Sequence, residues 1–172
     1  MTLERERAYR NIKDGSKSLL NIGQEVIDLM NIQKQFNPDI YKNNETGKYK
    51  VWINNLVPGN QQVSAGGFLG IGKYYIQEDR PNKNQVSSYF SSDSLLECQS
   101  YASYLSSKLV RFLVSCYYSK LTGVICKQCF KFVPLPPDNR FDHIFTDEEL
   151  YKYFNIPQKY IDVIDAVMKV RD

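Results

Sequence analysis

The chain has 172 residues, of which 42% are hydrophobic and 13% aromatic, and this is enough apolar side chain to build one folded core rather than a disordered polymer. No apolar run approaches the roughly 18 residues that a membrane-spanning helix needs, and the amino terminus, MTLERERAYR, is charged where a signal peptide would be apolar. We therefore expect a cytoplasmic protein that has no membrane partner.

The formal net charge is only +3, but the positive charge is concentrated in one segment. Residues 98–137 contain five basic side chains and no acidic one, whereas residues 138–172 have a net charge of −3. Lys and Arg release counterions from a phosphate backbone, so such a segment suits a surface that faces a polyanion. An ordinary solvated helix face is the equally simple alternative. The five basic residues are Lys108, Arg111, Lys120, Lys127 and Lys131.

The first half of the chain contains three short segments with a regular pattern. Residues 1–15 are charged and predict a poorly ordered polar tail, and the apolar spacing after it predicts a helix over residues 16–36. Alternating apolar and polar residues predict strands at 49–54 and 73–76. The glycine-rich stretch 66–72 between them lacks the spacing of a nucleotide-binding loop, so we interpret it as loop structure, with a DNA-contacting loop as the alternative.

A long helix is predicted in the middle of the second half. Ser94 and Glu97 have the spacing of a capping box, which places the start of a helix immediately after Ser94. Apolar residues then recur every three or four positions, so one long helix is expected near 95–120. Lys108 and Arg111 lie one turn apart on a different flank of this helix, where we expect phosphate contacts.

The remaining residues predict a strand and two further helices. Residues 124–133 have the composition of a strand, which the following proline-rich run ends. Thr146 and Glu149 form a second capping box before a short helix, and Pro157 fits the first turn of a last helix. The pattern as a whole predicts an α+β fold, in which a small mixed or antiparallel sheet packs with about four helices in one domain over residues 16–172.

The cysteines predict no metal site. Cys126 and Cys129 form a single CxxC pair, whereas a structural zinc site requires four ligands. The other candidate ligands, Cys98, Cys116 and His143, are not at zinc-ribbon spacing. Without a secretory signal we expect reduced thiols, and we interpret the pair as two small residues of a strand.

Several short motifs occur together in one order in the second half. The run from Ser87 to Pro134 contains YLSSK, then RFL, then FKFVP, and the acidic block DEELY follows at 147–151. That order resembles the carboxy-terminal target-recognition region of adenine-specific DNA methyltransferases of type II restriction-modification systems. The resemblance implies a region that binds duplex DNA and does no chemistry itself. It also implies a separate methyltransferase catalytic domain that holds the cofactor S-adenosylmethionine.

The catalytic motifs of such systems are missing from this sequence. The methyltransferase motif is Asn or Asp followed by Pro-Pro-Tyr or Pro-Pro-Phe, and the nearest string, NPDIY at 37–41, departs from it at Asp39. A metal-dependent nuclease needs Glu-x-Lys, yet no Glu here is followed two residues later by Lys. The single histidine, His143, is typical of a surface or capping residue. We therefore predict a non-catalytic fragment without a catalytic residue, metal or cofactor of its own.

The resemblance and the charge pattern together indicate which residues contact DNA. Two basic residues match the long helix of the family, two flank the predicted strand, and a Lys-Tyr pair follows the glycine-rich stretch. The 13 Tyr and 9 Phe include rings that could stack on an unstacked base, although most should belong to the core. The alternative function is a docking module of the same system, without autonomous DNA binding. The predicted DNA-contacting residues are Lys73, Tyr74, Lys108, Arg111, Lys127 and Lys131.

Overall fold

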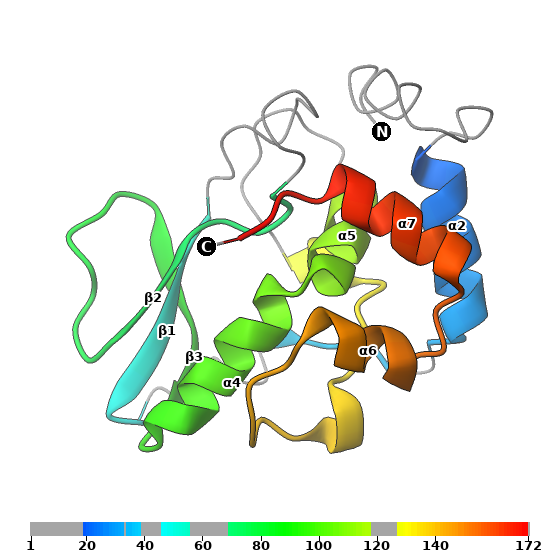
Figure 1. Ribbon diagram of the computed structural model, residues 1–172. Helices are drawn as coiled ribbons and strands as arrows, with labels where there is room; N and C mark the ends of the chain where they lie inside the picture. Colours follow the sequence, from blue (N-terminus) through cyan, green and yellow to red (C-terminus); the bar gives the residue numbers. More distant parts are fainter. Residues whose placement is uncertain (1–18, 33, 39–45, 56–68, 118–126, 172) are drawn as a thin grey trace.

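The computed structural model describes residues 19–32, 34–38, 46–55, 69–117 and 127–171, and the predicted polar tail lies outside them. The protein has an α+β fold, as the sequence predicts, with a three-stranded antiparallel sheet and five α-helices in the described part (Figure 1). None of the described helices is long and apolar enough to cross a membrane.

The sheet has the strand order β2-β1-β3, and both pairs are antiparallel. Strand β1 (Tyr49–Asn54) confirms the predicted first strand, and β2 (Tyr74–Gln77) confirms the second with a shift of one residue. Strand β3 (Val86–Ser92) was not predicted. Its register with β1 shifts between Val51 and Trp52, so Val86 and Ser88 pair with Asn54 and Trp52, whereas Phe90 pairs with Val51.

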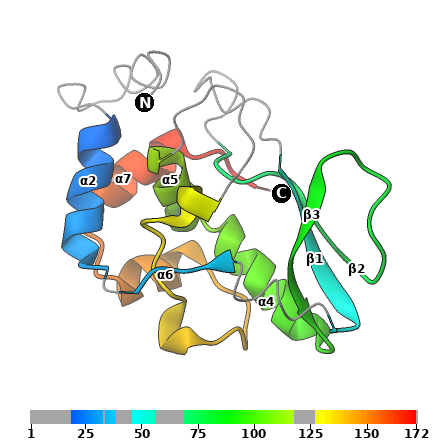
Figure 2. The same ribbon diagram turned by 180° about the vertical axis from the view of Figure 1, so that it is seen from behind.

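Helix α4 (Leu95–Ser106) covers one face of the sheet. Val51 is buried on that face of β1, and Phe90 is its register partner in β3. The ring of Phe90 stacks on Tyr101 of α4, with 4.6 Å between the ring centroids. Figures 1 and 2 show α4 on this side of the sheet and no described helix on the other.

The other helices surround α5 (Lys108–Tyr117), whose residues 111–116 are all buried. Helices α2 (Leu19–Met30), α6 (Asp147–Tyr153) and α7 (Gln158–Val167) and the 3-10 turn η2 (Lys127–Phe130) all contact it (Figure 2). An aromatic cluster joins this helical part to α4, because Phe36 lies 5.8 Å from both Tyr101 and Tyr104 between ring centroids. Tilted and edge-on contacts of this kind are favourable for aromatic rings.

The predicted long helix near 95–120 is two helices. Its start is confirmed, because Ser94 Oγ accepts a hydrogen bond from the backbone N–H of Glu97. The chain then leaves helical geometry at Ser107, which has φ −59° and ψ 148°. The Ser107 hydroxyl accepts from the backbone N–H of Val110, and the Asp147 carboxylate accepts from that of Lys108 at 2.7 Å. These two contacts cap the first turn of α5, so a second helix begins where the first one ends.

The predicted strand over 124–133 is wrong in its described part, since residues 127–130 form η2. Cys129, Phe130 and Val133 are all buried, and their spacing is that of a helical turn rather than of a strand. The last two helices are confirmed. Thr146 caps α6, and Pro157 precedes α7 in an extended conformation. A second short 3-10 turn, η3, covers Pro137–Asn139.

Candidate nucleic-acid interface

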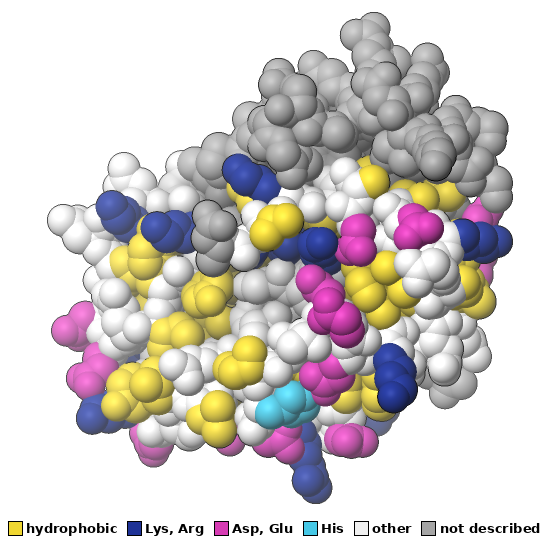
Figure 3. All heavy atoms as spheres, in the orientation of Figure 1, with side chains coloured by type: hydrophobic (Ala, Val, Ile, Leu, Met, Phe, Trp, Pro, Cys, Tyr) yellow, Lys and Arg dark blue, Asp and Glu magenta, His cyan; other side chains and the backbone are white. Residues whose placement is uncertain are grey.

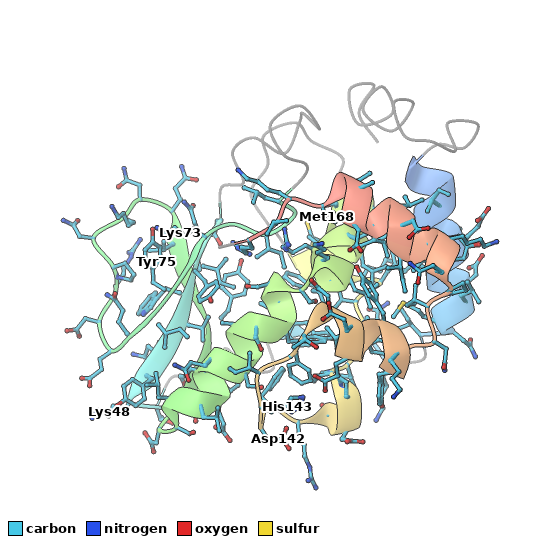
Figure 4. The ribbon with its side chains drawn as sticks, in the orientation of Figure 1. Lys48, Lys73, Tyr75, Asp142, His143 and Met168 are labelled. Carbon is cyan, nitrogen blue, oxygen red and sulfur yellow. The ribbon has the colours of Figure 1, made fainter. Side chains whose placement is uncertain are left out.

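The face of the sheet turned away from α4 combines lysines with large aromatic rings. In β1, Lys50 and Trp52 alternate with the buried residues that face α4. Trp52 is the register partner of Tyr75 in β2, so the two rings lie on the same side of the sheet. Lys73 lies two residues before Tyr75 and shares its face, as Figure 4 shows. We call Lys50, Trp52, Lys73 and Tyr75 the outer sheet face.

Each lysine of the outer sheet face lies against one of its rings. The ammonium of Lys73 lies 5.5 Å from the centroid of Tyr75, and that of Lys50 lies 6.0 Å from the centroid of Trp52. The indole N–H of Trp52 donates to the backbone carbonyl of Gln77 at 3.3 Å, which fixes the ring on the sheet. Both rings are half-buried. The result is a surface with positive charge and flat aromatic groups beside each other, which suits phosphates and bases together.

On the α4 side of the sheet, where Ser87 is the register partner of Ile53, Asn55 Nδ2 donates to the hydroxyl of Ser87 at 2.7 Å, and the hydroxyl of Tyr89 donates to Asn55 Oδ1 at 2.9 Å. The loop between β2 and β3 has two exposed basic residues, Arg80 and Lys83, and an exposed acidic one, Asp79.

An acidic group also lies near this surface. Glu78 forms an ion pair with Lys48 at 3.7 Å, and both side chains are mostly exposed. The outer sheet face is therefore basic, and the ion pair of Lys48 with Glu78 beside it has no net charge.

The predicted pair Lys73 and Tyr74 is divided between two sides of β2. Lys73 is exposed on the outer sheet face. Tyr74 points to the opposite side, is 36% exposed, and lies under the guanidinium of Arg171, 5.7 Å from its ring centroid. Successive side chains of a strand point to opposite faces, so the two residues cannot contribute to one surface.

The prediction that Arg111 lies on an exposed flank of the long helix is wrong, because this residue is only 1% exposed. Its guanidinium donates to the backbone carbonyls of Ser106 at 2.8 Å, Leu69 at 3.4 Å and Lys169 at 2.8 Å. Burial, and then the positive charge of Arg171, lower the pKa of Arg111 to about 10. In this conformation Arg111 joins three chain segments and does not reach a phosphate.

The other predicted basic residues lie apart from the outer sheet face. Lys108 has a side chain that is 20% exposed and forms an ion pair with Asp165 at 3.1 Å. Lys131 is exposed after η2 in the helical part, with its ammonium 5.2 Å from the centroid of Phe132. Lys127 begins η2, but its side chain lies outside the described part. Of the five predicted contacts whose side chains the structure describes, it brings only Lys73 into the outer sheet face.

Three residues of the outer sheet face were missed: Lys50, Trp52 and Tyr75. The alternation in β1 already shows that Lys50 and Trp52 share a face, but not which face is covered. The pairing with Tyr75 depends on strand register, which the sequence does not contain as a local signal.

The described end of the glycine-rich stretch has a structural role. Gly70 has φ +74°, and a Cβ atom built on it would lie 2.4 Å from the backbone oxygen of Arg111. A side chain has no room there, so this glycine allows the chain to pack against α5. Residues 66–68 lie outside the described part, and so does the DNA-contacting role considered for them.

The described residues contain no group of three or more metal-ligating side chains, and Cys126 of the CxxC pair lies outside them.

Comparisons with family models, with curated proteins and with solved structures found no match to this chain.

Proposed function

We propose that this chain is a DNA target-recognition region, which binds duplex DNA through the outer sheet face and positions a separate adenine-specific methyltransferase domain. The observation that carries the proposal is the array of Lys50, Trp52, Lys73 and Tyr75 on the face of the sheet that no described helix covers. The resemblance stated for the second half of the sequence is the reason for proposing DNA and a methyltransferase partner, and its motifs lie outside the outer sheet face. In this proposal S-adenosylmethionine and the methyl transfer belong to the other domain.

The outer sheet face would divide the two tasks of recognition among its groups. Lys50 and Lys73 would neutralise phosphates, which sets affinity and register without reading sequence. A β-ribbon fits the major groove, which is about 12 Å wide, so β1 and β2 could present Trp52 and Tyr75 to base edges and methyl groups. The exposed residues Arg80 and Lys83 would extend the contact along the backbone.

The docking alternative keeps part of its predicted surface. Ile164 and Met168 are buried in the core, whereas Tyr153 is 51% exposed and Ile161 is half-buried. If the protein acts as a docking module, it should bind the methyltransferase catalytic domain and should not bind DNA.

The test is fluorescence anisotropy with duplex DNA over a salt series, comparing Lys50→Ala/Lys73→Ala with Lys152→Ala/Lys159→Ala. Both double variants remove two exposed or half-exposed lysines, and Lys159 also lies over a ring, 4.7 Å from the centroid of Tyr160. The slope of log affinity against log salt should fall by about 1.8 for the first variant, at roughly 0.9 per phosphate contact, and its affinity by about tenfold. The second variant should change neither. Equal effects of the two variants would remove the outer sheet face from the proposal.

A further inference from the structure

Strand β2 leaves one edge of the sheet open. It pairs with β1, and no described strand lies on its other side. The backbone N–H of Asn54 donates to the carbonyl of Lys73 at 2.8 Å, so these two residues form a hydrogen-bonded pair of the ladder. Hydrogen-bonded and non-hydrogen-bonded pairs alternate along antiparallel strands. Tyr74 and Ile76 therefore point their backbone N–H and carbonyl groups away from β1 and out of the sheet.

The outward backbone groups of β2 can accept a further strand. Tyr74 and Ile76 each offer one N–H and one carbonyl, and among the described residues none forms a hydrogen bond with these groups. Open edges pair readily with another strand, and many sheets block them with proline or with a charged side chain. Strand β2 has the sequence YYIQ and contains neither. Nothing in its sequence therefore prevents it from pairing.

The charges at the two ends of β2 favour an antiparallel copy of the same strand as the partner. Lys73 precedes the strand, and the guanidinium of Arg171 lies at this end, 5.7 Å from the ring centroid of Tyr74. Asp79 and the ion-paired Glu78 follow the strand at its other end. Figure 3 shows hydrophobic side chains over β2, with basic side chains above them and acidic ones at the lower left. An antiparallel copy would place the basic end of each strand beside the acidic end of the other.

We propose that two copies of this chain pair along β2 in an antiparallel arrangement with two-fold symmetry. When the axis passes through Tyr75, Tyr74 of each copy bonds to Ile76 of the other, and all the outward backbone groups of β2 are used. An axis through Tyr74 or Ile76 would pair only one of these residues within the strand. On the α4 side, Tyr74, which is 36% exposed, would pack against Ile76 of the second copy.

This pairing would join the outer sheet faces of the two copies. The two sheets would become one continuous sheet, in which Tyr75 lies beside Tyr75 of the second copy. The lysines and rings of both copies would lie on the same side, related by the two-fold axis. Duplex DNA that contains an inverted repeat has the same symmetry, so the dimer would bind an inverted repeat. That consequence rests on the proposed function, whereas the pairing of β2 does not.

Disulfide trapping tests the register of the two strands. At the axis the two copies of residue 75 form a non-hydrogen-bonded pair, whose Cα atoms lie about 4.5 Å apart, which a disulfide can span. Tyr75→Cys should therefore give a cross-linked dimer on mild oxidation. Lys73→Cys is the matched control on the same face, because its two copies would lie about 13 Å apart. Both variants contain the same native cysteines, and Tyr75→Cys should cross-link at least about tenfold faster.

Sedimentation velocity without DNA tests the dimer itself. The contact is small, so we expect a Kd on the order of 10–100 μM. Ile76→Pro removes the N–H that bonds to the second copy, and the fold should tolerate it because this N–H does not bond to β1. The variant should dimerise at least about tenfold more weakly, with an unchanged circular dichroism spectrum. Lys50→Ala, in β1 and away from the edge, should dimerise as the wild-type chain does.

Three results would overturn the inference: a chain that stays monomeric well above this concentration range, equal cross-linking of the two cysteine variants, or dimerisation of a folded Ile76→Pro variant with wild-type affinity. A monomer would leave β2 to a strand of a different protein. Failure here is distinguishable from failure of the proposed function, because these experiments contain no DNA. Conversely, the salt dependence that tests Lys50 and Lys73 does not require a dimer.

Discussion

Replacing Arg111 by alanine should destabilise the fold rather than weaken a surface contact. The guanidinium is 1% exposed and donates to three backbone carbonyls, at 2.8, 2.8 and 3.4 Å. The variant would leave the carbonyls of Ser106 and Lys169 without their donor and would open a cavity beside α5. Both effects lower the free energy of unfolding.

The magnitude follows from the two short hydrogen bonds. A hydrogen bond to a charged group contributes roughly 1.5–3 kcal/mol, so the pair amounts to about 3–6 kcal/mol. Removing the buried charge also relieves its desolvation, the main reason that the pKa of Arg111 is lowered to about 10. We expect a net loss of about 3–5 kcal/mol, a large share of the roughly 5–15 kcal/mol by which domains are stable.

Urea denaturation followed by circular dichroism measures this loss, with Lys108→Ala as the neighbouring control. The ion pair of Lys108 with Asp165 is partly exposed, so its loss should change the free energy of unfolding by at most about 1 kcal/mol. If Arg111→Ala proves as stable as Lys108→Ala, the buried guanidinium does not stabilise the fold. The sequence-based prediction that Arg111 contacts DNA from α5 would then be the better account of this residue.

Three further predictions concern other contacts. The hydrogen bonds of His143 to Asp142 and then to Glu149 raise its pKa, so its stabilising contribution is full below about pH 6.5 and is lost as the pH rises through the folded-state value. His143→Gln should remove this pH dependence from the free energy of unfolding, and an unchanged pH profile would contradict it. Gly70→Ala should lower that free energy by about 1–3 kcal/mol in urea denaturation, because φ is +74° and backbone lies in the way; a neutral result would refute this. Ser94→Ala should lose the cap of α4 and about 1 kcal/mol, whereas Ser94→Asp should retain it, as thermal melts can check.

The sequence correctly predicted the helix starts that depend on residues close together in the chain. The capping residues Ser94 and Thr146 act within three residues of themselves, and both helix starts are confirmed. The end of α4 has a distant cause, because the carboxylate that caps Lys108 belongs to Asp147. Apolar spacing continues through Ser107 without interruption, so only the tertiary contact shows the break. Strand β3 was missed because its sequence, VSSYFSS, does not alternate between apolar and polar residues, and its register with β1 shifts between Val51 and Trp52.

The candidate site was harder to predict than the fold for the same reason. The basic stretch 98–137 indicated a positive surface, but charge along the sequence does not show which side chains are covered. Arg111 lies inside a helix that is surrounded on every side, whereas Lys50 was one lysine in a strand with no special signal. The outer sheet face exists only when two strands pair in register and α4 covers the opposite face.

The contacts of Arg111 and Arg171 also constrain when the protein can finish folding. Arg171 bonds to the carbonyl of Ile71, which precedes it by 100 residues, and Arg111 bonds to Lys169. The segment that leads into β2 therefore obtains its last hydrogen bonds only after residues 169–171 have been synthesised. During translation, which adds about 5–20 residues per second, this edge of the sheet stays incomplete until they leave the ribosome. We expect chains that stop before residue 169 to be cleaved by proteases near β2, at a distance from the missing residues in sequence but next to them in space.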